Sequence, residues 1–437
     1  MTVNVFGAGL AGCEAAYQLA KRGVCVKLYD MKPNKKTPAH NSDMFAELVC
    51  SNSLKAKRVE SAAGLLKEEM RHLDSLLVKC ADKCAVPAGG ALAVDREAFS
   101  ALVTEQIKNH NKIEFICKEV TSIPDDEISI IATGPLTSDA LSLYITQMLG
   151  DQLSFFDAAA PIVSAESIDM EHAFYESRYG KGGTDDYLNC PLNKEEYEIF
   201  YNELVNAERA PVHDFDVRDP KVYEGCMPIE VLAQRGVDTI RFGPMKPVGL
   251  RDPQTGHRPW AVLQLRKETA SGEMFNLVGF QTNLKFDEQK RVFSLIPALK
   301  NAEFHRFGVM HRNTFINSPK LLNADYTLKS NKNILFAGQI TGVEGYMESA
   351  SSGLIAGINA YLTACGKKTI VLPEYTMIGS LSRYISDETV NNFQPMGANF
   401  GVLPQLENRP RDKAERGAAY AQRAISSLDL FIKDNDI

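Results

Sequence analysis

With 437 residues, 44% of them apolar and 24% charged, the chain is long enough to form two or three domains with sizeable hydrophobic cores. Its formal net charge of −7 lacks the overall basic signature that is usual for a nucleic-acid-binding protein. Its apolar runs fall short of the roughly 18 residues of a membrane helix and no hydrophobic leader opens the chain, so we expect no membrane span and a cytoplasmic location.

The first predicted unit, residues 2–30, reads TVNVFGAGLAGCEAAYQLAKRGVCVKLYD. It combines a short apolar strand, a G-x-G-x-x-G pattern, a helical face and a second strand that ends in Asp30. Gly7 allows a tight turn, Gly9 lets the backbone approach a pyrophosphate, and Gly12 allows close helix packing. Asp30 is placed to accept hydrogen bonds from an adenosine ribose. We therefore predict that the backbone of this turn binds a dinucleotide through Gly7, Ala8, Gly9, Leu10, Ala11 and Gly12.

Two later stretches favour FAD over NAD in this unit. One is an apolar strand that ends at Gly134, and the other is a strand that breaks at Gly338 and Gln339 before a helix of small residues. Both resemble the flavoprotein pattern in which a strand ending in small residues runs beside the flavin. The expected fold is α/β, with a discontinuous Rossmann-like FAD-binding domain and an inserted α+β domain. Its predicted segments are 1–155 and 300–437 for the FAD-binding domain and 156–299 for the insertion.

The nine cysteines include no C-x-x-C pair, which argues against both a disulfide framework and a zinc site, so we expect free thiols and no bound metal. A helix predicted over residues 61–83 places Cys80 and Cys84 on its buried stripe. Cys25 and Cys117 fall in predicted strands and are expected in the core, and Cys13 is expected beneath the cofactor.

Two further thiols stand apart from these core positions. Cys226 precedes a predicted helix in YEGCMPIEVLAQRG, where helix-end N–H groups favour thiolate. Cys50 is followed by Ser-Asn-Ser, which favours a turn or a cap over a continuing strand. Sequence physics leaves both core packing and reactivity open for each of them.

Motifs along the whole chain resemble the folate- and FAD-dependent tRNA (uracil-5-)-methyltransferase family of bacteria. They include GAGLAGCEAA, TPAHNSDMFAELVCSNSL, VPAGGALAVDR, YEGCMPIEVLAQRG, VGFQTNLKF, FAGQITGVEGYMESASSG and NFQPMGANFG. The resemblance implies two catalytic thiols, which fall on Cys50 and Cys226. It also implies bound FAD, 5,10-methylenetetrahydrofolate as the one-carbon donor, NAD(P)H as a transient reductant, and uridine 54 in the T loop of tRNA as the target.

The chemistry implied by the resemblance needs a thiolate, because carbon 5 of uracil becomes nucleophilic only after a nucleophile adds to carbon 6. As a hypothesis, Cys226 is this nucleophile and Cys50 is the base that removes the carbon 5 proton, and the reversed roles remain possible. Rival functions are the same reaction on a ribosomal RNA uridine, an FAD oxidoreductase acting on a small metabolite, and a flavin-bearing RNA-binding factor without catalysis.

Substrate contacts are predicted at two places near these motifs. Local basic stretches at residues 32–36, 55–58 and 409–413 most simply form solvated surface. The family reading nevertheless requires RNA contacts, and Lys55, Lys57 and Arg58, which follow Cys50 closely, are the first candidates for phosphate binding. Tyr346 is a candidate for stacking on the pterin ring of the folate.

Overall fold

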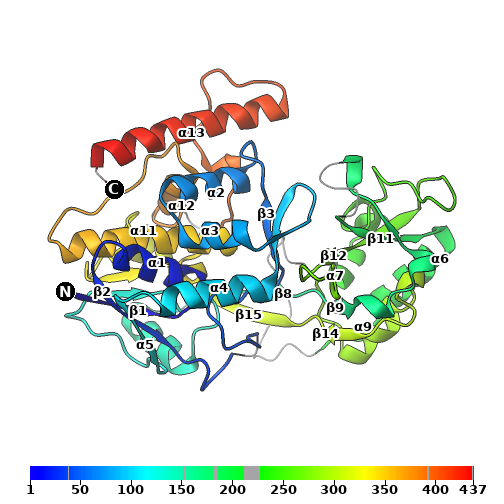
Figure 1. The fold of residues 1–437 in the computed structure, drawn as a ribbon, viewed down its shortest axis with the longest axis horizontal. Coiled ribbons are helices and arrows are strands. Elements are labelled where there is room, and N and C mark those ends of the chain that lie inside the picture. The colour runs from blue at the N-terminus through cyan, green and yellow to red at the C-terminus, as the bar shows by residue number, and fades with distance from the viewer. Residues whose placement is uncertain (38, 151–152, 181–185, 211–226, 391–392, 436) are drawn as a thin grey trace.

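The computed structural model describes residues 1–437 apart from 38, 151–152, 181–185, 211–226, 391–392 and 436. Two large hydrophobic cores form among the described residues, and Figure 1 shows the two bodies that contain them side by side. The main body combines residues before 153 with residues after 310, and the inserted body spans residues 159–306. The predicted fold class, a discontinuous α/β domain with an α+β insertion, is confirmed.

A parallel sheet with the strand order β16-β7-β1-β2-β6 organises the main body. Its strands are almost entirely apolar where they are covered on both faces, as parallel sheets usually are. β16 follows the insertion in sequence yet pairs with β7, so the C-terminal segment completes the sheet. The strands are β1 (Thr2–Phe6), β2 (Cys25–Asp30), β6 (Ile113–Cys117), β7 (Ser129–Ile131) and β16 (Ile334–Phe336).

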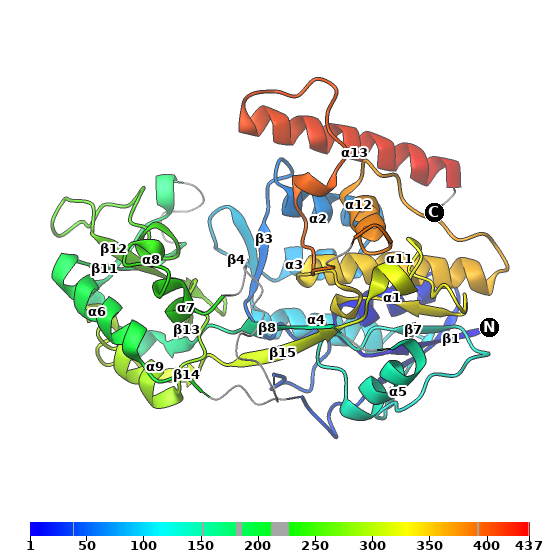
Figure 2. The ribbon, with the colours of Figure 1, turned by 180° about the vertical axis from the view of Figure 1, so that it is seen from behind.

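Helices cover this sheet, and the closest pair is α1 with α11. A Cβ atom on Gly353 would lie 2.1 Å from the carbonyl oxygen of Ala11, so only glycine permits this approach. Figures 1 and 2 both show α13 lying across α2 at the surface. The helices of the main body are α1 (Leu10–Ala20), α2 (Ala62–His72), α3 (Leu76–Lys83), α4 (Arg96–Lys108), α5 (Asp139–Leu149), α10 (Ser318–Leu321), α11 (Tyr346–Ala364), α12 (Met377–Tyr384) and α13 (Lys413–Asn435).

The single helix predicted over residues 61–83 is wrong, because the chain breaks between α2 and α3. Asp74 adopts a left-handed conformation with φ of +61°, and the Ser75 side chain caps the start of α3. The buried Glu14 carboxylate of α1 accepts hydrogen bonds from the first two backbone N–H groups of α3, at 3.2 and 3.0 Å. The break thus anchors α3 on α1 and satisfies its orphan donors.

The inserted body is built on an antiparallel sheet with the order β10-β11-β12-β13-β9-β14. Alternate residues of its central strands, such as Leu263 and Leu265 of β12, pack into the second core. The strands are β9 (Ile162–Ser164), β10 (Phe174–Tyr175), β11 (Leu188–Leu192), β12 (Ala261–Lys267), β13 (Met274–Leu277) and β14 (Phe304–Arg306). The helices are α6 (Lys194–Asn206), α7 (Ile229–Ala233), α8 (Thr239–Phe242) and α9 (Phe286–Phe293).

Two smaller strand groups lie where the bodies meet. An antiparallel ribbon of β8 (Leu153–Ala158) and β15 (Met310–Phe315) connects them, so residues on either side of the insertion pair with each other. A small sheet of β3 (Ser53–Ala56), β4 (Ala85–Val86) and β5 (Ala91–Val94) lies on the side of the main body that faces the inserted body (Figure 1). The predicted domain boundaries at residues 155 and 299 remain predictions, because paired strands and loops surround both points.

The described cysteines are free thiols with different surroundings. Cys13 and Cys80 are buried as predicted, and burial raises the pKa of Cys80 to about 12. Cys25 was expected in the core but is exposed, because Val26 and Leu28 take the inward positions of β2. Cys84 and Cys117 are half-buried. The described residues contain no group of three or more acidic, histidine or cysteine side chains able to hold a metal, and no described helix is long and apolar enough to cross a membrane.

Candidate active site

The glycine-rich turn between β1 and α1 is built for close backbone approach. Gly7 has φ of +102°, and a Cβ atom there would lie 2.5 Å from the carbonyl oxygen of Ala132. A Cβ atom on Gly12 would lie 1.8 Å from the carbonyl oxygen of Gly7. In contrast, a Cβ atom on Gly9 would meet nothing within 4 Å. Two glycines therefore shape the turn, and the third leaves open space over it for a ligand.

At this open space, no side chain of the first turn offsets the positive end of the helix dipole at the N-terminus of α1. Gly9 is its N-cap and supplies no side-chain cap, and the first turn holds no acidic residue. Asp30 lies at the end of β2 beside the turn. One of its carboxylate oxygens accepts a hydrogen bond from the Ala8 N–H at 2.8 Å, and the other accepts one from the Lys32 N–H at 2.9 Å. This geometry holds the turn and the carboxylate together at one end of a cavity.

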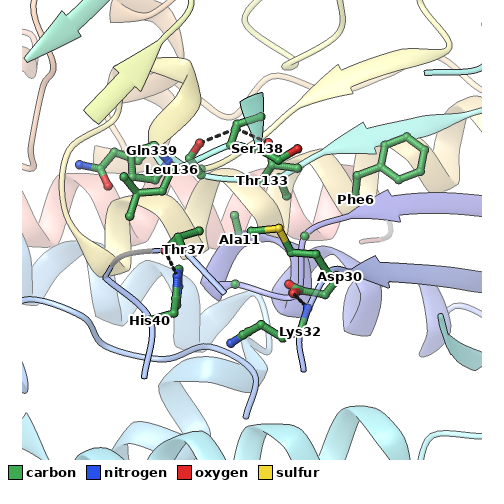
Figure 3. Close-up of a pocket in the computed structure, with 18 of the residues that line it drawn as sticks. Phe6, Ala11, Asp30, Lys32, Thr37, His40, Thr133, Leu136, Ser138 and Gln339 are labelled. Carbon is green, nitrogen blue, oxygen red and sulfur yellow. Dashed lines mark hydrogen bonds between the residues drawn. The ribbon is translucent and has the colours of Figure 1, made fainter. Parts of the chain in front are cut away.

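The cavity encloses about 1160 Å³ with its open mouth included, and it runs along the carboxyl ends of the parallel strands. Figure 3 shows Ala11 of α1, Asp30 at the end of β2 and Thr133 after β7 around the same space. Most predicted cofactor residues line it, namely Gly7, Gly9, Leu10, Ala11, Asp30, Gly134, Gly338 and Gln339. Ala8 and Gly12 support the turn from behind. The glycine-rich turn, the start of α1 and the Asp30 carboxylate are groups that suit a dinucleotide.

Residues that sequence reasoning missed close the cavity from the segment after β2. Lys32 was assigned to solvated surface, but it is buried, lines the cavity and donates to the carbonyl oxygen of Met44 at 2.5 Å. Thr37 and His40 also line it and are joined by a hydrogen bond of 2.6 Å (Figure 3). Burial, followed by the Lys32 charge, lowers the pKa of His40. In the sequence, the only indication that these residues would line the cavity was the position of their segment directly after Asp30, the predicted ribose-binding residue.

Cys50 is half-buried on a loop and directly follows Val49, which lines the cavity. The Tyr346 hydroxyl accepts hydrogen bonds from the backbone N–H groups of Cys50 at 2.7 Å and of Ser51 at 3.1 Å. The Cys50 sulfur is 3.6 Å from the carbonyl oxygen of Ala158. Burial and the nearby Cys50 thiol raise the pKa of Tyr346, so its hydroxyl stays neutral near pH 7. Tyr346 also lines the cavity, which brings its ring and the Cys50 loop to one end of it.

The fold gives the three residues predicted to contact phosphate different surroundings. Lys55 donates to the buried Glu348 carboxylate at 2.7 Å, although 47% of its side chain is still exposed. Lys57 and Arg58 are exposed beyond the end of β3. Lys55 therefore has a role in joining β3 to α11, whereas the other two cations face solvent.

The second predicted thiol, Cys226, lies outside the described residues. The described chain resumes at Met227, and α7 begins at Ile229 after its N-cap Pro228, as the sequence predicted for this segment. The buried Glu230 carboxylate anchors α7 by accepting hydrogen bonds from the Thr282 hydroxyl at 2.9 Å and from the Asn283 N–H at 2.8 Å.

Comparison with known proteins identifies the family of the chain. Residues 2–368 match the family described as Glucose inhibited division protein A. The chain is 61% identical over 98% of its length to the methylenetetrahydrofolate--tRNA-(uracil-5-)-methyltransferase TrmFO of Acetivibrio thermocellus, covering 98% of that protein. It is 57% identical to the TrmFO of Staphylococcus aureus strain Newman, with 99% of each chain covered.

Solved structures support the fold. The structure of Aquifex aeolicus GidA in its form II crystal superposes with a TM-score of 0.70 at 18% identity, over 98% of this chain and 73% of that one. By the extent and level of these matches, the chain belongs to the Glucose inhibited division protein A family and, within it, to the methylenetetrahydrofolate--tRNA-(uracil-5-)-methyltransferase TrmFO proteins.

Proposed function

We propose that the protein methylates carbon 5 of uridine 54 in the T loop of tRNA, in the cytoplasm, with bound FAD, 5,10-methylenetetrahydrofolate as the one-carbon donor and NAD(P)H as the reductant. One observation carries the proposal. In a chain 61% identical to a protein named for this reaction, the Cys50 loop is held by Tyr346, which lines the same cavity as the glycine-rich turn.

FAD fits the residues that line the cavity. The turn from Gly7 to Gly12 and the start of α1 would hold its pyrophosphate, and Asp30 would hold its ribose. Gly134, Gly338 and Gln339 would lie along the ring end, towards Tyr346. When bound, FAD would supply the hydride that completes the methyl group.

The two thiols divide the remaining chemistry in this proposal. Cys226 forms a bond to carbon 6 of uracil, and the electron pair of the carbon 5–carbon 6 double bond moves onto the carbonyl at carbon 4. The resulting enolate attacks the electrophilic methylene through carbon 5. Cys50 removes the proton from carbon 5, and the bond between the methylene and the nitrogen that carried it breaks, which leaves an exocyclic methylene on carbon 5. After hydride addition to this methylene, the sulfur–carbon bond breaks and the Cys226 thiolate leaves. The backbone contacts of Cys50 with Tyr346 support its role as the fixed base.

Substrate binding is proposed at two places. The Tyr346 ring would contact the pterin of the folate, because the ring lines the cavity while its hydroxyl is engaged with the Cys50 loop. Lys57 and Arg58 would contact tRNA phosphates, because both are exposed just beyond the end of β3, the strand that follows that loop. Lys55 would contribute through its exposed part only.

The test uses purified flavin-loaded protein, labelled methylenetetrahydrofolate, NAD(P)H and an unmodified tRNA transcript. Labelled 5-methyluridine should form at position 54 only when all four components are present. Cys50→Ala should abolish it, whereas the matched control Cys25→Ala, at an exposed thiol on β2, should not. Label entering ribosomal RNA instead of tRNA, or oxidation of a small metabolite with neither RNA labelled, would overturn the proposal.

A further inference from the structure

The carboxyl end of β12, in the inserted body, grips the loop that carries Cys50. The Arg266 guanidinium donates to the Ser51 hydroxyl and to the Asn52 side-chain oxygen, both at 2.8 Å. The Asn52 side-chain amide donates in return to the carbonyl oxygen of Lys267 at 2.9 Å. Arg266 and Asn52 are both buried. The residues directly after Cys50 are therefore fixed to the inserted body as well as to the main body.

The residues directly before Cys50 are held by two more guanidinium groups. Arg96, at the start of α4, donates to the carbonyl oxygen of Leu48 at 2.6 Å, and Arg306 of β14 donates to the carbonyl oxygen of Val49. Arg96 is itself fixed by Glu268, because its Nε and Nη2 atoms donate to the two carboxylate oxygens at 3.0 and 3.1 Å. This fork-shaped ion pair joins the main body to the inserted body.

Four residues, which we call the Cys50 clamp, leave a surplus of positive charge beside the thiol. They are Arg96, Arg266, Glu268 and Arg306. The clamp holds three guanidinium groups and one carboxylate, and only 2% of Glu268 and 5% of Arg266 is exposed. Burial lowers the pKa of Arg266 and of Arg306, and the Arg96 charge lowers that of Arg306 further.

We propose that Glu268 is a positioning residue of the methylation reaction, which holds Arg96 across the two bodies and so fixes the Cys50 sulfur and the charge beside it. The proposal rests on the proposed role of Cys50 as a catalytic thiol. It assigns the placing of that thiol to the inserted body, which also carries the segment leading to α7.

Glu268→Gln tests the proposal, because it keeps the size of the side chain and removes the charge that holds Arg96. Arg96→Lys is the second variant, since it keeps a cation near Leu48 but cannot form the two-point ion pair. Glu288→Gln is the matched control, because Glu288 also lies in the inserted body and pairs with Arg291 at 2.8 Å, but at the surface. Each flavin-loaded protein is assayed for kcat and KM with tRNA, for flavin content, and for the rate at which iodoacetamide alkylates Cys50, with exposed Cys25 as the internal reference.

We expect Glu268→Gln and Arg96→Lys to lower kcat about 10- to 100-fold, as a displaced reacting group does, with KM for tRNA and flavin content close to wild type. The alkylation rate of Cys50 should change about threefold or more, because the loop that carries its sulfur is no longer held in place, while that of Cys25 stays constant. Glu288→Gln should match wild type.

Wild-type kcat and wild-type Cys50 alkylation in both clamp variants would overturn the proposal. A loss of activity that only follows a loss of flavin would overturn it too, because it would show a structural role. If Glu268→Gln does not fold, the kcat, flavin content and Cys50 alkylation rate of Arg96→Lys test the proposal instead. Failure of the proposed function is distinguishable, since the wild type would then leave tRNA unmethylated while Cys50 alkylation still responded to the clamp.

Discussion

At the scale of single residues, the site depends on a few side chains that each satisfy several backbone groups. The Tyr346 hydroxyl serves two N–H donors of the Cys50 loop, and the Glu14 carboxylate serves two at the start of α3. Because an unsatisfied buried donor is costly, each such oxygen fixes a local conformation that the backbone would not keep alone.

Tyr346→Phe should lower the rate of methyl transfer without releasing the cofactor. The variant keeps the ring in the cavity but removes the acceptor for Cys50 and Ser51, at a cost of about 1 to 3 kcal/mol in the free energy of unfolding. Single-turnover transfer to tRNA and urea unfolding measure the two effects. Tyr361→Phe, on the same helix, is the matched control. A variant that transferred methyl groups at the wild-type rate would show that the hydroxyl does not position Cys50.

At the scale of elements, close packing of α1 on α11 helps to shape the cavity. Gly353→Ala would force a Cβ atom to 2.1 Å from the Ala11 carbonyl oxygen, so the two helices must separate. We expect a loss of about 1 to 3 kcal/mol in unfolding free energy and a lower flavin content. Gly90→Ala, where a Cβ atom meets nothing within 4 Å, is the control. Equal flavin content and equal urea midpoints in the two variants would contradict this account of the packing.

A buried carboxyl joins α2 to α12 and makes stability depend on pH. The Glu69 carboxylate accepts hydrogen bonds from the backbone N–H groups of Met377 at 2.6 Å and Ile378 at 2.9 Å, while burial raises the pKa of Glu69 from 4.5 to about 8. Between these two values the folded state binds more protons than the unfolded state, so this contribution to stability is lost as pH rises towards 8. The loss is at most about 1.4 kcal/mol per pH unit.

Urea unfolding at pH 6 and pH 8 measures this effect. Glu69→Gln removes the titrating group, so the difference in stability between the two pH values should be smaller in the variant than in the wild type. The exposed Glu105→Gln is the control and should keep the wild-type difference. An unchanged pH dependence in Glu69→Gln would show that Glu69 is ionised throughout this range.

Sequence patterns predicted the central strands of the main sheet well, because β1, β7 and β16 are buried on both faces and read as apolar runs. They failed where a local signal competed with the helical pattern. The apolar stripe runs on through residues 61–83, but Asp74 and Ser75 end one helix and cap the next. Cys25 was assigned to the core because period-2 alternation does not reveal which face of β2 is inward.

At the scale of the whole molecule, the contacts that place Cys50 join residues far apart in sequence. Tyr346 and Cys50 are 296 positions apart, and Glu268 and Arg96 are 172 apart. No periodicity or local motif relates such pairs, so the sequence predicted a functional thiol at Cys50 but could not predict what holds it. The same limit explains why Lys32 was assigned to the surface although it closes the cavity.

The arrangement of the molecule also places two basic stretches near each other. A Cβ atom on Gly417 would lie 2.2 Å from the carbonyl oxygen of Glu60, so the start of α13 packs beside the turn that carries Lys57 and Arg58. Figure 1 shows this end of α13 above β3. The basic stretch at residues 409–413 leads into α13 and ends at its first residue, Lys413, so it lies near the same turn.

The Lys57→Ala/Arg58→Ala double variant should bind tRNA more weakly, because it loses contacts with the phosphates. The plot of log affinity against log salt should become shallower by about 0.7 to 0.9 for each lost contact. Filter binding at several salt concentrations measures both effects. Lys367→Ala/Lys368→Ala, at exposed positions after α11, is the control and should match wild type. An unchanged salt slope in the first variant would remove this surface from the RNA-binding site.

The central claim, that Cys226 and Cys50 act on one uracil with different roles, is tested most directly by trapping the covalent adduct. A T-arm hairpin with 5-fluorouridine at position 54 is incubated with flavin-loaded protein and methylenetetrahydrofolate, and the cross-linked peptide is identified by mass spectrometry. The account predicts an adduct on Cys226 in the wild type and in Cys50→Ala, and no adduct in Cys226→Ala. An adduct that forms on Cys50 in Cys226→Ala would contradict it.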